Sequence, residues 1–161
     1  MSDKKSRGPR RKARELALSA LYMMDMQAGT GVSEAIHQAP HLTKNEENEA
    51  IELFFKEHDP ASGKTLEYAR RLVSGVRERR QDIDRRIEEA SEHWKLSRIA
   101  RIDRNILRMS AFEMLFDSET PPQVSIDEAV ELAKKYGSEE SSAFINGVLD
   151  KIKRTMDGKG K

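Results

Sequence analysis

"SIDEAVELAKKYGSEESSAFINGVLDKIKRTM" occupies residues 125–156 and holds two helix-length patterns joined by a short polar link. In both patterns apolar residues recur every three to four positions, as on the buried face of an α-helix. Ser125 and Glu128 have the spacing of a capping box, which predicts that the first helix begins at Ser125. Gly137 stands where a glycine often follows a helix, and the second pattern runs over 141–156. This stretch therefore predicts two successive helices.

The same period extends over most of the remaining chain, and alternation typical of β-strands is nearly absent. We predict a first helix that ends near 28–31, a short helix within 32–39, a helix at 46–57, one long or once-broken helix over 64–94, and a helix at 103–116. The sequence thus predicts an all-α fold of about seven helices over 13–156. We expect residues 1–12 to form a basic, partly disordered arm and residues 157–161 a frayed tail.

Composition argues against several classes of protein. The chain of 161 residues has no cysteine, which excludes disulfides, thiolate metal sites and cysteine nucleophiles. No apolar run approaches the roughly 20 residues that span a bilayer, so we expect a cytoplasmic protein without a membrane partner. His37 and His41 are four residues apart, but Pro40 lies between them, so we interpret them as surface histidines. Phosphate-binding glycine motifs are absent, and we predict neither an enzyme nor a metal or cofactor site.

Charge is concentrated at the N-terminus. The whole chain has a net charge of +1, whereas residues 1–14 alone have +6 and the remainder therefore −5. Such a block is typical of an arm that binds nucleic acid or an anionic membrane, and a role in solubility alone is the alternative. The cations of this block are Lys4, Lys5, Arg7, Arg10, Arg11, Lys12 and Arg14.

A second candidate site lies where the two C-terminal helices meet. Lys134, Lys135 and Tyr136 end one predicted helix, and the next begins near Ser141. An aromatic ring beside cations can stack on a base and hold its phosphate, as in many single-stranded RNA sites. Lysines at a helix C-terminus also favour the helix dipole, so helix stabilisation is the alternative. For Phe144, core packing and base contact both stay open.

Three ordered blocks resemble the family of the transcription antitermination factor NusB. They are "RRKARELALSALY" at 10–22, "DRNILRMSAFEML" at 103–115 and "PQVSIDEAVELAKKYGSEESSAFINGVLDKI" at 122–152. The resemblance implies a fold of two small packed helical bundles. It also implies that the protein binds boxA-type RNA of nascent ribosomal transcripts together with NusE, a small-subunit ribosomal protein, in the RNA polymerase antitermination complex. Whether the free protein forms a homodimer stays open.

By position, the resemblance implies one surface for RNA and another for NusE. The NusE surface would include Tyr22 and Asp103. The candidate RNA-binding residues combine those that the resemblance implies with the two lysines of the C-terminal corner. They are Arg7, Arg10, Arg11, Lys12, Arg14, Lys134, Lys135, Tyr136, Glu140 and Phe144. The alternative function is a helical protein-interaction module whose basic arm is incidental.

One glycine in the resembling blocks needs a reason of its own. Gly147 follows Asn146 in the middle of the last predicted helix, where glycine costs about 1 kcal/mol relative to alanine. Close approach of a neighbouring helix would explain it. We therefore expect Gly147 to have a packing role.

Overall fold

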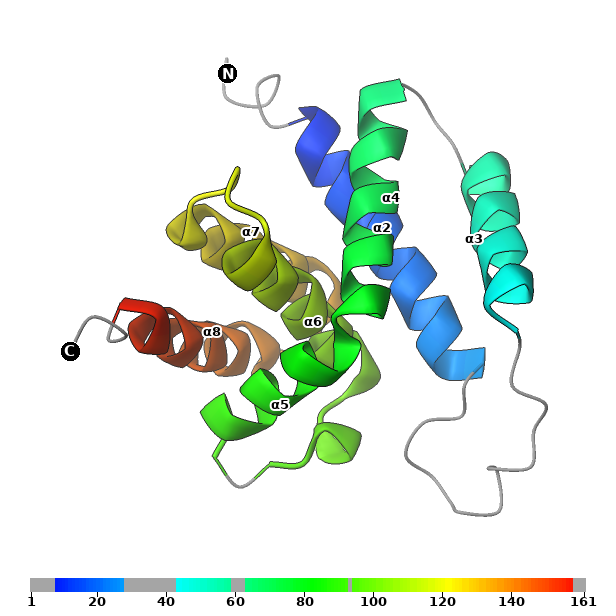
Figure 1. The fold of residues 1–161 in the computed structure, drawn as a ribbon. Helices are drawn as coiled ribbons and strands as arrows, with labels where there is room; N and C mark the ends of the chain where they lie inside the picture. The colour runs from blue at the N-terminus through cyan, green and yellow to red at the C-terminus, as the bar shows by residue number, and fades with distance from the viewer. Residues whose placement is uncertain (1–7, 28–42, 59–62, 93, 158–161) are drawn as a thin grey trace, which may run out of the picture. The chain divides into compact units, whose positions relative to one another are not determined.

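The computed structural model describes residues 8–27, 43–58, 63–92 and 94–157. These ranges contain seven α-helices, one short 3₁₀ helix and no β-strand, which confirms the predicted all-α fold (Figure 1). The α-helices are α2 (Gly8–Gln27), α3 (Lys44–His58), α4 (Gly63–Glu78), α5 (Arg80–Ala90), α6 (Arg101–Phe116), α7 (Pro122–Tyr136) and α8 (Ser141–Asp157), and the 3₁₀ helix is η2 (Leu96–Arg98). The predicted short helix at 32–39, His37 and His41 lie outside the described residues.

The chain divides into two compact units, Met1–Arg71 and Leu72–Lys161, and the division falls inside α4. The first unit holds α2, α3 and the first part of α4, and α2 contacts α3. Its buried apolar residues follow the helical period, as the sequence predicts. They are Ala13, Ala17, Leu18, Ala20, Leu21, Ile51, Phe54, Phe55, Tyr68 and Ala69.

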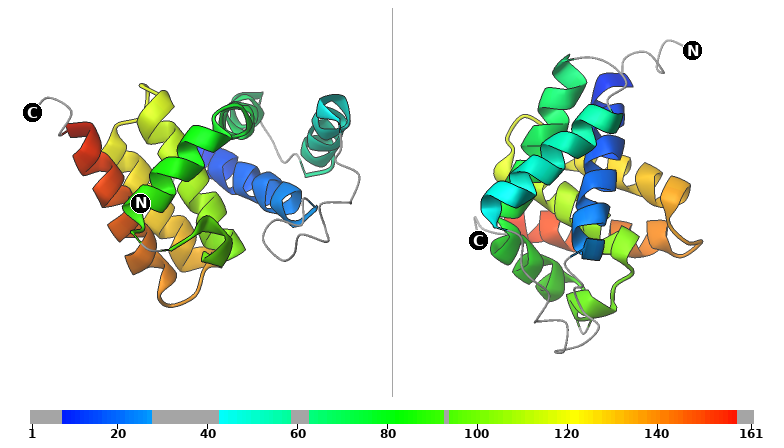
Figure 2. Two further views of the ribbon diagram at one scale, coloured as in Figure 1. Left: turned by 60° about the horizontal axis from the view of Figure 1, so that its bottom comes forward. Right: turned by 90° about the vertical axis from the view of Figure 1, so that its right-hand side faces the viewer.

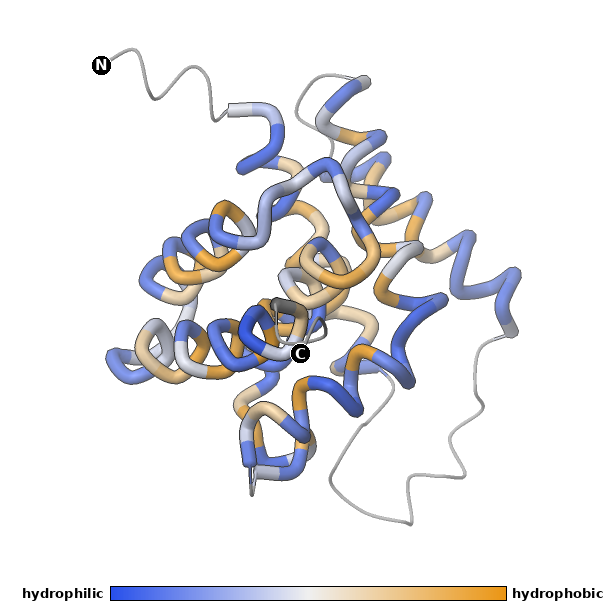
Figure 3. The backbone as a smooth tube through the Cα atoms, turned by 60° about the vertical axis from the view of Figure 1, so that its left-hand side comes forward, coloured by the Kyte–Doolittle hydropathy of each residue, from blue (hydrophilic) through white to orange (hydrophobic). Residues whose placement is uncertain are grey.

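The second unit is built around α6. This helix packs against α5, α7 and α8, and α7 and α8 also contact each other; both views in Figure 2 show α6, α7 and α8 side by side. The tube in Figure 3 shows how hydrophobic and hydrophilic positions alternate around the turns of these helices. Every residue from Asp103 to Met114 is buried. The central helix is therefore enclosed on all sides rather than along one stripe.

Six of the buried residues of α6 are polar or charged: Asp103, Arg104, Asn105, Arg108, Ser110 and Glu113. Burial of such groups is costly unless they are hydrogen-bonded. Arg108 donates two hydrogen bonds to Asp84 of α5, from Nε at 2.8 Å and from a terminal nitrogen at 3.2 Å. The Ser110 hydroxyl donates to the backbone carbonyl of Ser125 in α7 at 3.0 Å. These polar contacts connect α6 to its neighbours.

Helices α2 and α7 begin three or more residues earlier than the sequence predicts. Helix α2 begins at Gly8, so residues 8–12 of the expected arm are helical. Helix α7 begins at Pro122, and the predicted capping box at Ser125 and Glu128 is wrong because Ser125 lies inside the helix. Proline suits the first helical position, where its fixed φ fits and no N–H is needed. Of the two alternatives for 64–94, one long or one once-broken helix, the structure shows the broken one, as α4 and α5 with Arg79 between them.

A capping box does exist at the start of α3. The Thr43 N–H donates to the Glu46 carboxylate at 2.7 Å, and the Glu46 N–H donates to the Thr43 hydroxyl at 3.2 Å. The backbone hydrogen bond from Thr43 is the main cause of a lowered pKa of Glu46, because it favours the ionised carboxylate. This reciprocal pair satisfies two N–H groups at the beginning of α3.

The close helix approach predicted at Gly147 is wrong, because nothing lies within 4 Å of where its Cβ would be and the residue is exposed. The close approach occurs instead at Gly75 in α4. A Cβ at Gly75 would overlap the ring of Phe112 in α6. Gly75 therefore leaves room for the Phe112 ring of α6 against the part of α4 that belongs to the second unit.

Candidate nucleic-acid interface

The first candidate site is the basic start of α2, in the first unit. Arg10 and Lys12 are exposed, and Arg11 is half-buried. Arg14 is only 4% exposed, which differs from the expectation of an arm that reaches into solvent. Arg7 lies outside the described residues. The first turn of α2 contains no acidic residue, although a negative charge is favourable at that end of the helix dipole.

Tyr68 of α4 lies against two of these arginines. The guanidinium carbon of Arg10 is 5.0 Å from the centre of the Tyr68 ring, and that of Arg14 is 5.7 Å from it. Both distances are within the range of cation–π contacts. Tyr68 is itself buried. Tyr68 could not be found from the sequence, because nothing nearby in the chain connects it to α2.

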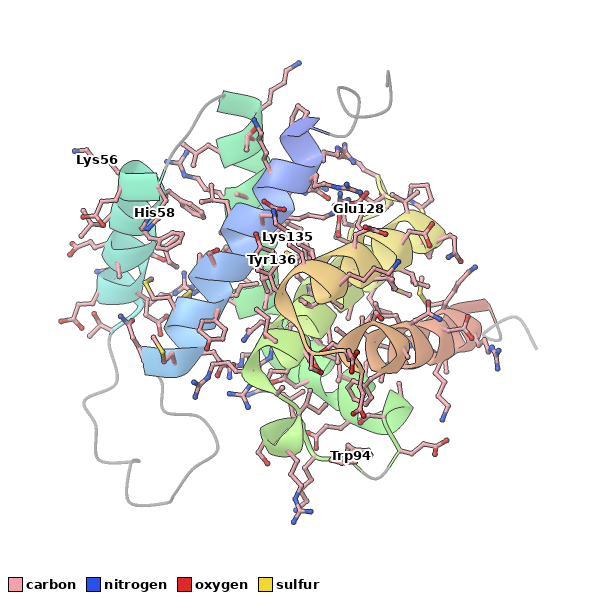
Figure 4. The ribbon with its side chains drawn as sticks, turned by 180° about the vertical axis from the view of Figure 1, so that it is seen from behind. Lys56, His58, Trp94, Glu128, Lys135 and Tyr136 are labelled. Carbon is pink, nitrogen blue, oxygen red and sulfur yellow. The ribbon has the colours of Figure 1, made fainter. Side chains whose placement is uncertain are left out.

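The second candidate site is the end of α7, in the second unit. The Tyr136 side chain is 44% exposed, and the Lys135 ammonium is 5.2 Å from the centre of its ring. Figure 4 shows Lys135 and Tyr136 next to each other at this end of α7. Lys134 pairs with Glu131 at 3.6 Å on the helix surface. The structure thus brings together an exposed ring and a cation, as the sequence predicts for this corner.

The link from α7 to α8 is held by short-range contacts. The Gly137 N–H donates to the Ala133 carbonyl at 2.8 Å, and the Ser138 N–H donates to the Ser141 hydroxyl at 2.9 Å. A Cβ at Gly137 would lie 2.5 Å from the Ser141 oxygen and 2.8 Å from the Ala133 carbonyl oxygen. Gly137 has extended backbone, with φ −92° and ψ −171°, so this close fit rather than a left-handed turn requires glycine. The link positions Tyr136 relative to the start of α8.

The other predicted residues of this corner differ in exposure. Glu140 is exposed in the turn before α8. Phe144 is half-buried in the first turn of α8, and its N–H donates to the Glu140 carbonyl at 3.1 Å. The structure therefore leaves part of Phe144 reachable from solvent.

The two residues predicted to contact NusE lie in different units. Tyr22 is half-buried in α2, whereas Asp103 in the first turn of α6 is only 7% exposed. Burial raises the pKa of Asp103, and a hydrogen bond with the Ser141 side chain lowers it in part. Its Oδ1 has no hydrogen-bond partner in the part of the chain that the structure describes. A partner could reach only a small part of this carboxylate.

Sites of two other kinds are absent from the described ranges. None of the helices there combines the length and the apolar character that a bilayer crossing requires. Nor do three or more histidine, aspartate or glutamate side chains gather within the described ranges in a way that could hold a metal ion.

Comparison with known proteins identifies the family. The model of the NusB family matches residues 11–154. The chain is 45% identical over 153 residues to the transcription antitermination protein NusB of Geobacter sulfurreducens, covering 95% of this chain and 99% of that protein. It is 45% identical over 145 residues to the NusB protein of Myxococcus xanthus, covering 90% of this chain and 94% of that one.

Solved structures agree with these sequence matches. The NusB structure from T. maritima has a TM-score of 0.72 at 33% identity and covers 90% of each chain. A crystal structure of the antitermination factors NusB and NusE in complex with double-stranded RNA also has a TM-score of 0.72, at 26% identity, and covers 91% of this chain and 97% of that one. The family match, the relatives and the fold lead to one conclusion: this chain belongs to the NusB family.

Proposed function

We propose that this protein is a transcription antitermination factor that binds boxA-type RNA of nascent ribosomal transcripts together with NusE. It acts by binding, without catalysing a reaction, as part of the RNA polymerase antitermination complex in the cytoplasm. The observation that carries the RNA assignment is the exposed Tyr136 ring with Lys135 beside it at the end of α7. Membership in the NusB family supports the partner assignment.

The two candidate sites suit different parts of an RNA strand. Arg10 and Lys12 are exposed cations that can bind phosphates of any sequence. Tyr136 offers a face for a base, and the exposed Glu140 carboxylate can accept a hydrogen bond from a base amino group. We therefore assign affinity mainly to the start of α2 and discrimination between sequences mainly to the end of α7.

One observation favours the alternative, a protein-interaction module whose basic arm is incidental. Arg14 is buried and lies against Tyr68, so at least one cation of the basic block stabilises the fold. A module of this kind would bind NusE but have no measurable affinity for RNA.

Titration of the purified protein with labelled RNA separates the two functions. The probes are a boxA-like single strand, a scrambled single strand and a boxA-like duplex, each at two salt concentrations and with or without NusE. For an RNA-binding factor, the boxA strand binds most tightly, and log affinity falls with log salt by about 0.7 for each phosphate contact on a single strand.

The alternative gives a different result. If none of the three probes binds at low salt with NusE present, the result would contradict the RNA-binding function. Preference for the duplex would retain RNA binding but contradict single-stranded boxA as the ligand. Sedimentation of the free protein, with and without NusE, shows whether a homodimer precedes the complex.

A further inference from the structure

The start of α2 combines several electrostatic features that oppose each other. Arg10 and Arg14 are four residues apart, so both side chains lie on the same side of the helix and repel each other. They also lie near the helix N-terminus, where positive charge is unfavourable. The guanidinium carbons of both nevertheless lie within 6 Å of one ring centre.

The ring that they share belongs to Tyr68. Its side chain is 8% exposed, so the ring is fixed by its surroundings rather than free to rotate away. An aromatic face attracts a cation electrostatically, and the attraction is stronger where water is excluded. Arg14 is buried beside this ring, while Arg10 is exposed. Tyr68 therefore contacts one arginine of the interior and one that reaches the surface.

Stacking and hydrogen bonding use different parts of a guanidinium. The flat face contacts an aromatic ring, whereas the N–H donors lie in the plane and form hydrogen bonds to phosphate oxygens. A stacked arginine can therefore bind phosphate while its side chain is already ordered. Ordering a long side chain on binding costs free energy, and prior ordering reduces that cost.

We propose that Tyr68 is a positioning residue for RNA binding, whose ring holds the Arg10 guanidinium in place to contact an RNA phosphate. This inference rests on the proposed function. It adds a residue of the α4 core to the RNA-binding machinery, although Tyr68 itself does not contact RNA.

A double-mutant cycle on RNA affinity tests this role. Arg10→Ala is compared with the unchanged chain and, separately, in a Tyr68→Leu background, with circular dichroism to confirm that each variant is folded. We expect Arg10→Ala to weaken binding less in the Tyr68→Leu background, and the two losses to differ by roughly two- to fivefold, the range of an exposed cation–π contact. Tyr68→Phe keeps the ring and should bind RNA like the unchanged chain.

Lys12 supplies the matched control. It is an exposed cation on the same helix, so Lys12→Ala should weaken RNA binding by the same factor with or without the Tyr68 ring. Equal losses for Arg10→Ala in both backgrounds, or a Tyr68→Phe variant as weak as Tyr68→Leu, would overturn the proposal.

A second variant covers the case in which Tyr68→Leu does not fold. Arg10→Lys keeps the charge but removes the planar group, so we expect it to bind both cognate and scrambled RNA more weakly; unchanged affinity would overturn the proposal. If the unchanged protein binds none of the RNA probes, the proposed function fails as well. If it binds and only the coupling is absent, the positioning role alone fails.

Discussion

At the scale of single residues, Gly75 shows a strict steric requirement. Its missing Cβ makes room for the Phe112 ring, which is itself buried and lies 6.3 Å from the ring of Phe116. We expect Gly75→Ala to lower the free energy of unfolding by about 1–3 kcal/mol, as overpacking of a core commonly does. Urea denaturation measures this, and Phe112→Leu in the same chain should recover part of the loss. A stability unchanged by Gly75→Ala would contradict the close contact.

Gly147 is the matched glycine, because it also lies in the middle of a helix but faces open space. Gly147→Ala removes the entropic cost of glycine without a clash. We expect the free energy of unfolding to rise by up to about 1 kcal/mol. The same urea experiment measures both glycines, and a large destabilisation here would show that the residue has a contact that the described chain does not reveal.

Asp103 predicts a specific pH dependence of stability. Burial raises its pKa above the ordinary value of 3.8, so the folded protein keeps a proton that the unfolded chain has released. Its contribution to stability therefore decreases as pH rises from the ordinary pKa through the raised one, and stays low above it. We expect Asp103→Asn to be more stable relative to the unchanged chain at pH 7 than at pH 4. Thermal melts over this pH range test the sign, and a difference that grows toward low pH would contradict it.

At the scale of helices, an ion pair joins α5 and α6. The Arg108 side chain is 5% exposed and that of Asp84 20% exposed. Asp84→Ala would leave a buried guanidinium without its main carboxylate, and we expect a loss of about 3 kcal/mol in the free energy of unfolding. Asp82→Ala is the control, since its pair with Arg85 is exposed and should contribute less than about 1 kcal/mol. Equal losses for the two variants would show that the buried pair has no special role.

The helices themselves were predictable from sequence, whereas several of their contacts were not. The apolar period predicted α3, α6, α8 and the helical stretch over 64–94, because helical spacing is a local property of the chain. It did not decide between one long helix and the observed α4 and α5. The buried charges of α6 could not be predicted, because Arg108 finds its partner 24 residues away, in another helix. The predicted capping box at Ser125 is wrong, because the helix already begins at Pro122. The capping box that does occur, at Thr43, was not predicted.

The same distinction applies to the candidate site. Lys135, Tyr136 and the start of α8 are neighbours in sequence, so their proximity followed from the predicted helix boundaries. Tyr68 is 54 residues or more from the arginines that it contacts, so no local pattern indicated the pair. The burial of Arg14 could not be predicted for the same reason, because the ring beside it is far away in sequence.

At the scale of the whole molecule, charge and aromatic side chains are distributed between different parts of the chain. Residues 1–14 carry a net charge of +6 in a protein whose total is +1. Exposed cations attract any RNA strand, because phosphate charge is the same for every sequence. Discrimination needs a fixed ring and groups that contact base edges, and these lie at the end of α7. Affinity and specificity should therefore respond to different substitutions.

This separation gives the last prediction. Arg10→Ala combined with Lys12→Ala should weaken binding of boxA-like and scrambled RNA by similar factors and flatten the salt dependence by about 0.7 for each phosphate that the variant no longer binds. Tyr136→Ala should instead weaken binding of the boxA-like strand by roughly 1–3 kcal/mol, the range for removal of one stacked base, and affect the scrambled strand less. Tyr136→Phe keeps the ring and should retain the preference. Because Tyr136 is 44% exposed, its truncation should leave the fold intact, which thermal melting can verify. If Tyr136→Ala reduces binding of both strands equally, the ring acts as a general contact, and discrimination between sequences must come from another part of the protein.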